Sequence, residues 1–393
     1  MRSRLPALLC VAVVCIVLNL GLWPFHAPAN SVSWLPARNG LAFAKAASVF
    51  TPGDLRAEGP VPGSDGSVEV WAQPSEWRTA TLLTLYNPRS RAWLAIRQSL
   101  TDLEVAAESP NHHAGIARSD FHVHYVLARS LQRRMPVFIT AAWGSRGVAV
   151  YLNGVLVRTV PAFQVPAGVL GARLILADRP EQPDNFRGQV FGLALYQSEL
   201  DAAAVLRHYR AWTGAGKPGA APEEGMVALY LFDERGGDTV RNHVPGGAAL
   251  SIPRTYTVVD KKALEPFWNE FEFARSYWSG NFKNIVGFLP VGFCFYVYFT
   301  VARPLARPAV AAVIAGALIS FAIEVLQIFL PTRDSGTTDL ITNTLGTWLG
   351  VLCRREIYPP LQNRFPWLAS LPFGPAGGPN KVRANCGRSP SAG

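Results

Sequence analysis

Long apolar runs near both ends of the chain constrain its fold more than any other feature. Residues 5–25 carry no charge, and three further apolar runs occupy 284–302, 308–331 and 340–353. A helix of about 20 apolar residues spans the roughly 30 Å of hydrocarbon in a bilayer, so every run except the short last one is long enough to cross it. We therefore expect a membrane protein with a large insert outside the membrane.

The charge distribution predicts an orientation in that membrane. The net charge is +10, but residues 38–254 hold 22 Lys and Arg against 19 Asp and Glu, so most of the excess lies elsewhere in the chain. The flanking basic clusters are Arg2 with Arg4, Arg303 with Arg307, and Arg354 with Arg355. All three lie on one side if the N-terminus is cytoplasmic, which is the positive-inside pattern. The insert and the turn at 332–339 then face outward, and the charge gives no indication of nucleic-acid binding.

The first apolar run, within residues 1–30, has two interpretations. One is an uncleaved signal anchor that serves as a transmembrane helix. The other is a cleaved signal peptide, because Ala27-Pro28-Ala29 has the A-x-A form of a cleavage site. The apolar stretch is longer than a usual signal-peptide core and Pro28 lies at the site, which favours the anchor. Both interpretations export the insert.

The insert, residues 38–258, has the pattern of an all-β domain. Its clearest element is GVAVYLNGVLVRTV (147–160), two alternating strands around Asn153-Gly154, which is typical of a type I′ hairpin. Further strands are expected at 67–74, 80–88, 121–128, 171–178, 188–197 and 225–234. One helix is expected at Glu199–Trp212. All five cysteines lie outside this domain, so no disulfide framework is predicted for it.

Several segments of the insert resemble the LamG-like, concanavalin A-like jelly-roll family. They are NGLAF (39–43), VEVWAQP (68–74), YLNG (151–154), FRGQVFGLALYQSEL (186–200) and LFDERGGDTVRNH (231–243). The resemblance implies a sandwich that binds carbohydrate or protein, in some relatives with calcium. Hydrolases of this family carry closely spaced carboxylates on one strand, and no strand here has that pattern, so we do not expect hydrolysis by this domain.

Two groups of residues in the insert are candidates for metal binding. His122 and His124 stand on one face of a predicted strand, and Asp233 with Glu234 could help to hold calcium. Such side chains more often face solvent without a ligand. We therefore expect no cofactor, with calcium in the jelly roll as the alternative.

Two segments flank the C-terminal apolar runs. The first, 264–280, alternates aromatic and charged residues, a composition typical of the headgroup level of a membrane, so we predict an interfacial segment on the outer leaflet. The second, 359–393, is rich in Pro, Gly, Asn and Ser and is predicted to be a disordered cytoplasmic tail.

Polar residues interrupt the last two apolar runs. Helical spacing puts Ser320, Glu324 and Gln327 on one face of the first. The same spacing puts Asp339 and Asn343 on one face of the next, together with the glycines of a G-x-x-x-G motif. An ionisable group at membrane depth costs about 2.5–3.5 kcal/mol on insertion scales and is usually paired or functional. We expect the two polar faces to meet.

Residues 281–355 resemble the VanZ-like family of small bacterial membrane proteins. The segments that carry the resemblance are NFKNIVGFLPVGF (281–293) and EVLQIFLPTRDSGTTDLITNTLGTWLG (324–350). The matching positions are Asn284, Phe288, Pro290, Gly292, Glu324, Gln327, Arg333, Asp339, Asn343, Gly346 and Gly350. The resemblance implies a role at the cell envelope and, through the founding member, a link to low-level teicoplanin resistance. It implies no defined biochemical activity.

The polar residues of this region form the candidate ligand-binding site. They are Asn284, Glu324, Gln327, Arg333, Asp339 and Asn343. A guanidinium suits phosphate, and carboxamides and carboxylates suit hydroxyls, so the predicted ligand is an anionic or polyhydroxylated headgroup. Two alternatives remain open. In one, Glu324 pairs with Arg333 and the set is a structural scaffold; in the other, Glu324 or Asp339 accepts a proton in an enzyme or transporter.

The chain is thus predicted to have two parts, an exported all-β jelly-roll sandwich and an α-helical transmembrane bundle. We expect it in the inner, plasma membrane of a bacterium. Its predicted partners are membrane lipids and an envelope glycan or lipid-linked precursor. Binding is favoured over catalysis, and we assign no catalytic residue.

Overall fold

The computed structural model describes residues 4–56, 65–108, 123–127, 129–215, 223, 225–271, 273, 275–365 and 367. The chain divides into two compact units. The sandwich unit comprises residues 24–263 and 328–334. The helical unit comprises residues 1–23, 264–327 and 335–393. Each unit is described by itself below.

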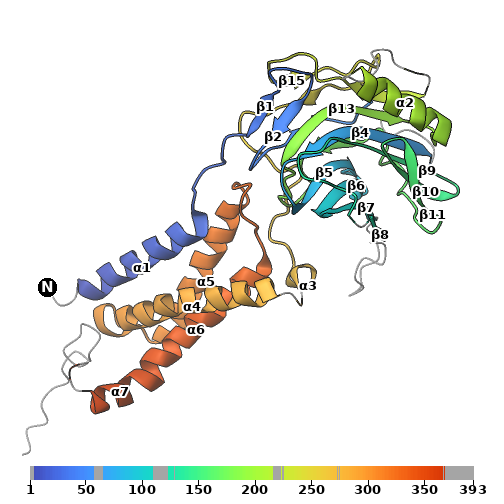
Figure 1. Cartoon of the computed structure of the whole chain (residues 1–393). Helices are drawn as coiled ribbons and strands as arrows, with labels where there is room; N and C mark the ends of the chain where they lie inside the picture. Colours follow the sequence, from blue (N-terminus) through green and yellow to red (C-terminus); the bar gives the residue numbers. More distant parts are fainter. Residues whose placement is uncertain are drawn as a thin grey trace, which may run out of the picture. The chain divides into compact units, whose positions relative to one another are not determined.

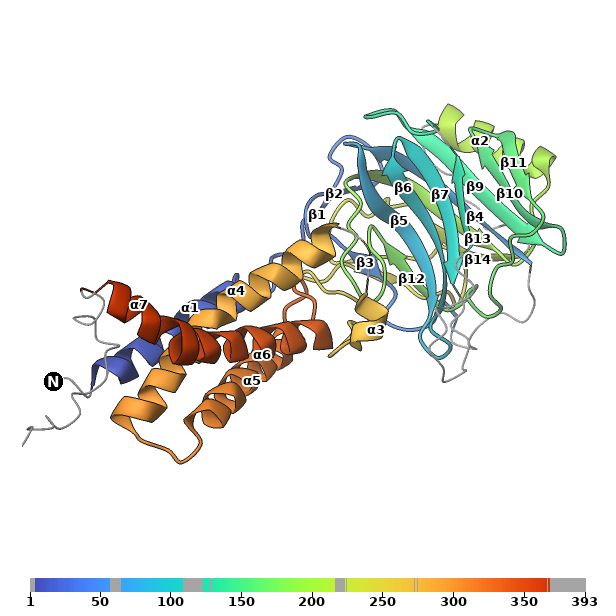
Figure 2. The ribbon, with the colours of Figure 1, turned by 90° about the horizontal axis from the view of Figure 1, so that it is seen from below.

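The sandwich unit consists of two antiparallel sheets (Figures 1 and 2). The first has the order β1 (Val32–Trp34), β2 (Leu41–Phe43), β13 (Gly188–Tyr196), β4 (Gly66–Pro74), β9 (Val137–Gly144), β10 (Gly147–Leu152), β11 (Val155–Val160), and β14 (Met226–Tyr230) also pairs with β13. The second has the order β15 (Thr239–Val240), β16 (Leu250–Ser251), β3 (Val49–Phe50), β12 (Arg173–Leu176), β5 (Arg78–Asn87), β6 (Ala92–Leu100), β7 (Asp102–Glu108), β8 (Val123–Leu127). The predicted β-sandwich is confirmed.

Apolar side chains from the inner faces of both sheets form one core. Val70, Ile139 and Leu193 contribute from the first sheet, and Leu83 and Leu94 contribute from the second; all five are almost completely buried. This packing follows from the alternation of side chains along each strand, which turns every second residue toward the facing sheet.

The predicted type I′ hairpin joins β10 and β11. Asn153 and Gly154 both have positive φ, 51° and 79°, as this turn requires. Leu152 faces Val155 across the turn, so the register matches the sequence prediction.

Helix α2 (Ala202–Gly214) lies across the outer face of the first sheet (Figure 1). It begins after Asp201, whose side chain accepts a hydrogen bond from the backbone N–H of Ala204 at 2.7 Å. Trp212 packs edge-on against Phe138 of β9. The helix predicted at 199–212 therefore exists, and its start is fixed by this N-cap.

The helical unit contains the apolar runs. Its helices are α1 (Leu5–Leu22), α3 (Phe267–Glu270), α4 (Arg275–Val297), α5 (Pro308–Gln327), α6 (Thr337–Leu352) and α7 (Tyr358–Arg364), with π-helical turns at Tyr298–Ala302 and Cys353–Ile357. Within the part of the chain that the structure describes, three segments are long and apolar enough to cross a membrane, namely Leu5–Leu22, Tyr277–Ala302 and Pro308–Gln327. Together with the sandwich, these helices confirm the predicted fold class.

The ends of two elements differ from the ranges that the sequence suggested. Helix α4 begins at Arg275, inside the segment expected at the membrane interface, so that part of the segment is helical. Helix α7 reaches Arg364, so the first residues of the predicted tail are helical as well. The tail beyond residue 367 lies outside the described residues.

Candidate functional site

The α5–α6 hairpin brings the two predicted polar faces together. Ser320 and Glu324 lie on α5, and both are at least 99% buried. Asn343 of α6 is 95% buried and donates a hydrogen bond from Nδ2 to Ser320 Oγ at 3.0 Å. Glu324 Oε2 accepts a hydrogen bond from the backbone N–H of Gly336 at 2.9 Å, just before α6 begins. The helical periodicity of the sequence therefore identified both faces correctly.

The N-terminus of α6 is capped by groups of the helical unit itself. The first backbone N–H groups of a helix have no partner within the helix and attract anions. Glu324 binds the N–H of Gly336, and Glu270 Oε2 accepts from the N–H of Thr338 at 2.9 Å. Between them, the N–H of Thr337 donates to the carbonyl of Glu265 at 2.8 Å. These three donors are therefore already occupied.

A third helix joins the cluster through α4. Asn284 Nδ2 donates to Asp339 Oδ1 at 2.7 Å, and both residues are partly exposed. Deeper in the cluster, Asn343 Oδ1 and Thr338 Oγ1 are buried and have no hydrogen-bond partner among the described residues. These two oxygens are the open hydrogen-bonding positions of the site.

The remaining two candidates are Gln327 and Arg333. Gln327 Nε2 donates to the carbonyl of Gly21 in α1 at 2.9 Å, so this side chain links two helices. Arg333 belongs to residues 328–334, a segment of the sandwich unit. The helical unit therefore joins Asn284 to Asp339 and brings Glu324 and Asn343 to the same hairpin. A ligand-binding role for the six candidates remains a prediction.

Helices α4 and α6 pack closely against each other. A Cβ on Gly346 would meet the carbonyl of Ile285, and one on Gly350 would meet the carbonyl of Leu289. The G-x-x-x-G motif thus allows α4 and α6 to approach each other closely.

Sequence reasoning missed Glu270, which caps α6 from a different part of the chain. It lies in a short helix whose aromatic residues carry no helical periodicity, and it is far in sequence from Thr338. No pattern in the sequence connects the two residues.

A second buried polar cluster lies under α2 in the sandwich unit. Glu69 of β4 is fully buried. Its Oε2 lies 2.9 Å from His208 Nδ1 and accepts a hydrogen bond from Tyr196 OH at 3.1 Å. His208 Nε2 lies 3.1 Å from Glu223 Oε2, so both ring nitrogens face carboxylates, as in a protonated imidazole. Burial lowers the pKa of His208, but the two carboxylates outweigh it and raise the pKa overall. Burial raises the pKa of Glu69. The cluster fastens α2 to the sheet.

The metal candidates gain no support from the described part of the chain, which holds no group of three or more His, Cys, Asp or Glu placed to bind a metal ion. Asp233 lies 3.5 Å from His243 Nε2, and Glu234 accepts a hydrogen bond from the N–H of Arg241. His122 and the side chain of His124 lie outside the described residues.

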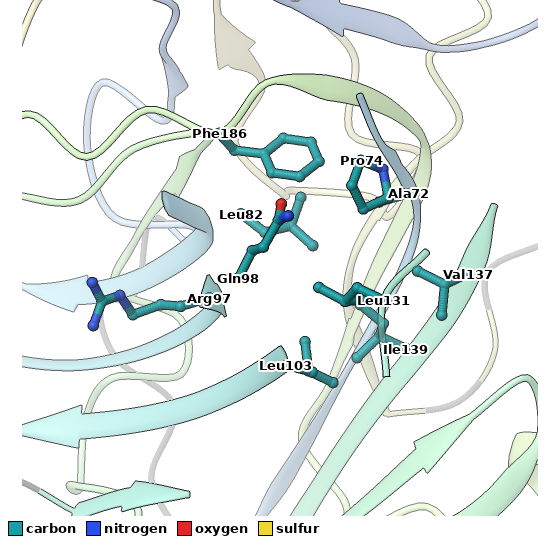
Figure 3. A pocket seen from close by; sticks show the side chains of 10 residues that line it. All are labelled: Ala72, Pro74, Leu82, Arg97, Gln98, Leu103, Leu131, Val137, Ile139 and Phe186. Carbon is teal, nitrogen blue, oxygen red and sulfur yellow. The ribbon is translucent and has the colours of Figure 1, made fainter. Parts of the chain in front are cut away.

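A small hollow between the sheets is an interior packing feature. Its apolar walls include Leu82, Leu131 and Phe186, and Figure 3 shows Gln98 pointing toward Phe186 while the Arg97 guanidinium points away. It has room for about one water molecule. Gln98 Oε1 is buried without a partner among the described residues, so a water molecule there would satisfy it.

Comparisons with known proteins support the assignment of the helical region. Residues 239–357 match the family model described as VanZ/LLP1. The chain thus contains a VanZ-like region, and its apolar helices indicate association with a membrane. No curated protein matches the chain.

Solved structures similar to this chain include three with carbohydrate-binding or pentraxin domains. A putative carbohydrate-binding protein from Bacteroides ovatus has 9% identity and a TM-score of 0.37, with 57% of this chain and 62% of that one covered. The SAP-like pentraxin from Limulus polyphemus has 11% identity and a TM-score of 0.33, with 59% and 96% covered. The CBM40 domain of the Ruminococcus gnavus IT-sialidase, bound to α2,3-sialyllactose, has 13% identity and a TM-score of 0.32, with 43% and 95% covered. Similarities this distant assign no ligand to this chain.

Proposed function

We propose that this protein works in the bacterial plasma membrane, where its helical unit binds the hydroxyl-bearing headgroup of a lipid-linked envelope molecule. The observation that carries the proposal is a pair of buried oxygens, Asn343 Oδ1 and Thr338 Oγ1, that have no hydrogen-bond partner among the described residues. Leaving a buried acceptor unsatisfied costs about 1–3 kcal/mol. A donor that reaches these atoms, from a ligand hydroxyl or from water, therefore stabilises the cluster.

The donors and acceptors of the cluster favour hydroxyls over phosphate at its inner part. The N–H groups of Gly336, Thr337 and Thr338, where an anion would bind, already donate to groups of the protein. The open positions are an amide oxygen and a hydroxyl, beside the buried carboxylate of Glu324. A hydroxyl group can donate to the open amide oxygen, whereas an ionised phosphate ester has only acceptor oxygens and cannot.

The VanZ-like region supports the envelope part of the proposal. We extend it in two ways that rest on sequence resemblance: the sandwich binds a surface glycan, and the protein lowers susceptibility to teicoplanin. The basic clusters that flank the apolar runs support an exported sandwich with both chain ends in the cytoplasm.

The experiment that tests the proposal compares Asn343→Leu with Thr344→Val in full-length protein in lipid nanodiscs. Leucine keeps the branching of asparagine at Cγ and removes the open acceptor together with the donor to Ser320. The hydroxyl of Thr344 instead bonds back to the carbonyl of Leu340 and lies outside the cluster. The probes are a polyprenyl diphosphate that carries a disaccharide and the same lipid without the sugar. We expect wild type and Thr344→Val to prefer the sugar-bearing lipid, and Asn343→Leu to lose that preference by about tenfold, the value of one hydrogen bond of about 1.4 kcal/mol.

Equal binding of the two lipids by wild type would overturn the proposal, as would an unchanged preference in Asn343→Leu. The proposed effect on teicoplanin is tested by measuring the susceptibility of a sensitive host that expresses these variants at matched membrane levels. Binding of the full-length protein to a panel of surface glycans tests the sandwich part. A negative result in either experiment would contradict that part of the proposal and would leave the lipid-binding part to its own test.

A further inference from the structure

An exposed aromatic cluster lies where the chain enters its second membrane-length helix. Phe267, Trp268 and Phe273 are 49%, 63% and 80% exposed, and Trp278 is 55% exposed. Phe271 makes edge-on ring contacts with Phe273, Tyr277 and Trp278 at centroid distances of 5.0, 5.7 and 6.2 Å. The rings thus contact one another while much of their surface stays uncovered by protein. We call these residues, between Glu265 and Trp278, the aromatic segment.

The position of the segment along the chain identifies what covers it. It leads directly into Tyr277–Ala302, which is long and apolar enough to cross a membrane. The residues that precede a span lie at the boundary between water and hydrocarbon, where tryptophan and tyrosine are enriched because their rings have an apolar body and a polar tip. The occupant of the exposed aromatic surface is therefore the headgroup layer of the lipid bilayer.

The same segment is fastened to the start of α6 by hydrogen bonds. Glu270 Oε2 accepts from the N–H of Thr338 at 2.9 Å, and the carbonyl of Glu265 accepts from the N–H of Thr337 at 2.8 Å. The N–H of Glu265 in turn donates to the carbonyl of Ser335 at 3.0 Å. A Cβ on Gly336 would collide with the Glu270 carboxylate, so the segment approaches the loop as closely as a glycine allows.

We propose that the aromatic segment binds the lipid headgroup layer and, through Glu265 and Glu270, holds the N-terminus of α6 in place. The element held this way is the one that Glu324 caps and that carries Asn343, so contact with lipid orders the buried polar cluster. This coupling requires no ligand and stands independently of the function proposed above.

Lipid contact is tested by quenching tryptophan fluorescence of the full-length protein in vesicles of phosphatidylethanolamine and phosphatidylglycerol that contain brominated lipid. The variant with Trp268→Phe and Trp278→Phe loses two tryptophans of the segment, and Trp77→Phe removes a tryptophan of the sandwich that is 59% exposed. We expect the quenched fraction to fall in the double variant and to rise slightly in Trp77→Phe. Acrylamide in the aqueous phase gives the converse measurement, because it quenches tryptophans that face water. If the double variant keeps its quenching by brominated lipid and loses quenching by acrylamide, the segment does not lie in lipid and the proposal is overturned.

The coupling is tested by hydrogen exchange at the backbone amides of residues 336–338 in the same vesicles. Glu270→Ala removes the acceptor of the Thr338 amide, and Gly336→Ala displaces the Glu270 carboxylate from that amide. Gly280→Ala is the control, because a Cβ at this position meets nothing within 4 Å. We expect exchange to speed up about tenfold in the first two variants and to stay unchanged in the control, since a lost hydrogen bond lowers the cost of local opening. The variant with Trp268→Ser and Phe273→Ser leaves no hole in the core, because both rings are exposed. It should give the same increase, and unchanged exchange in it would overturn the coupling.

Discussion

Asp178 is a buried carboxyl group of the sandwich, and its burial makes the stability of the fold depend on pH. It is 1% exposed, and its two carboxylate oxygens accept hydrogen bonds from Tyr256 OH at 2.6 Å and from the N–H groups of Arg179 and Asp184 at 2.9 and 2.7 Å. Burial outweighs these bonds and raises the pKa of Asp178 to about 7. The folded protein therefore holds the proton more tightly than the unfolded chain does.

The sign of the pH dependence follows from that shift. Between the unfolded value of 3.8 and about 7, the unfolded chain releases the proton and the folded chain keeps it, so the free energy of unfolding falls as pH rises, by at most about 1.4 kcal/mol per pH unit. Asp178→Asn removes this contribution. The measurement is the melting temperature of the sandwich, in full-length protein in detergent, as pH rises from about 4 to about 7. We expect it to fall less steeply in the variant than in wild type.

Asp238→Asn serves as the matched control, because Asp238 is an exposed aspartate of the same unit. Parallel curves for wild type and Asp178→Asn across this range would contradict the prediction.

Among the elements, the α4–α6 pair depends most on glycine. A Cβ on Gly292 of α4 would collide with the carbonyl of Thr347 in α6, a backbone atom that cannot move away as a side-chain tip can. A Cβ on Gly287 of the same helix meets nothing within 4 Å. Two glycines of one helix therefore differ in their surroundings while sharing their secondary structure.

Alanine substitutions at these two glycines should act in opposite directions. Gly292→Ala forces the helices apart and should destabilise the helical unit by about 1–3 kcal/mol, as overpacking does. Gly287→Ala should be neutral or stabilise it by up to about 1 kcal/mol, because alanine is the better helix former. Resistance of the full-length protein to denaturant in lipid nanodiscs measures both, and equal effects at the two positions would contradict the packing argument.

The elements also show where sequence patterns suffice and where they fail. The β10–β11 hairpin was predictable because Asn153-Gly154 is compatible with two positive φ values. The β6–β7 hairpin was missed because Leu100, which has φ 57°, occupies its turn and no glycine or proline marks it. Strand β9 was missed because both of its faces are buried, so its sequence is continuously apolar and lacks the alternation that marks a half-buried strand. One face meets the core between the sheets, and Phe138 on the other face packs against α2.

At the scale of the whole molecule, the candidate site was predictable only in part. Helical periodicity identified the buried faces of α5 and α6, because spacing along a helix determines which residues share a face. It did not predict that Glu270 caps α6 or that Gln327 binds the carbonyl of Gly21, since these contacts join segments distant in sequence. The burial of the open oxygens of Asn343 and Thr338 depends on how the helices pack, which no local pattern specifies.

The orientation of the molecule in the membrane leads to a last prediction. Three basic clusters flank the apolar runs, and all lie in the cytoplasm if the N-terminus does. The α4–α5 loop, which contains Arg303 and Arg307, should then be cytoplasmic, and the α5–α6 loop should face outward. In a variant without native cysteines, Ala306→Cys and Thr332→Cys report on these two loops, since both positions are exposed.

We expect a membrane-impermeant maleimide to label Thr332→Cys in intact spheroplasts and Ala306→Cys only after the membrane is permeabilised. Adding lysines near residue 332 supplies the control, because shifting the positive charge to the outer loop should reduce its outward labelling. The opposite pattern in the parent variant would place the α5–α6 loop, with the start of α6 and the polar cluster, at the cytoplasmic face. An envelope ligand presented from outside could not reach the cluster there, so this result would contradict the proposed function together with the orientation.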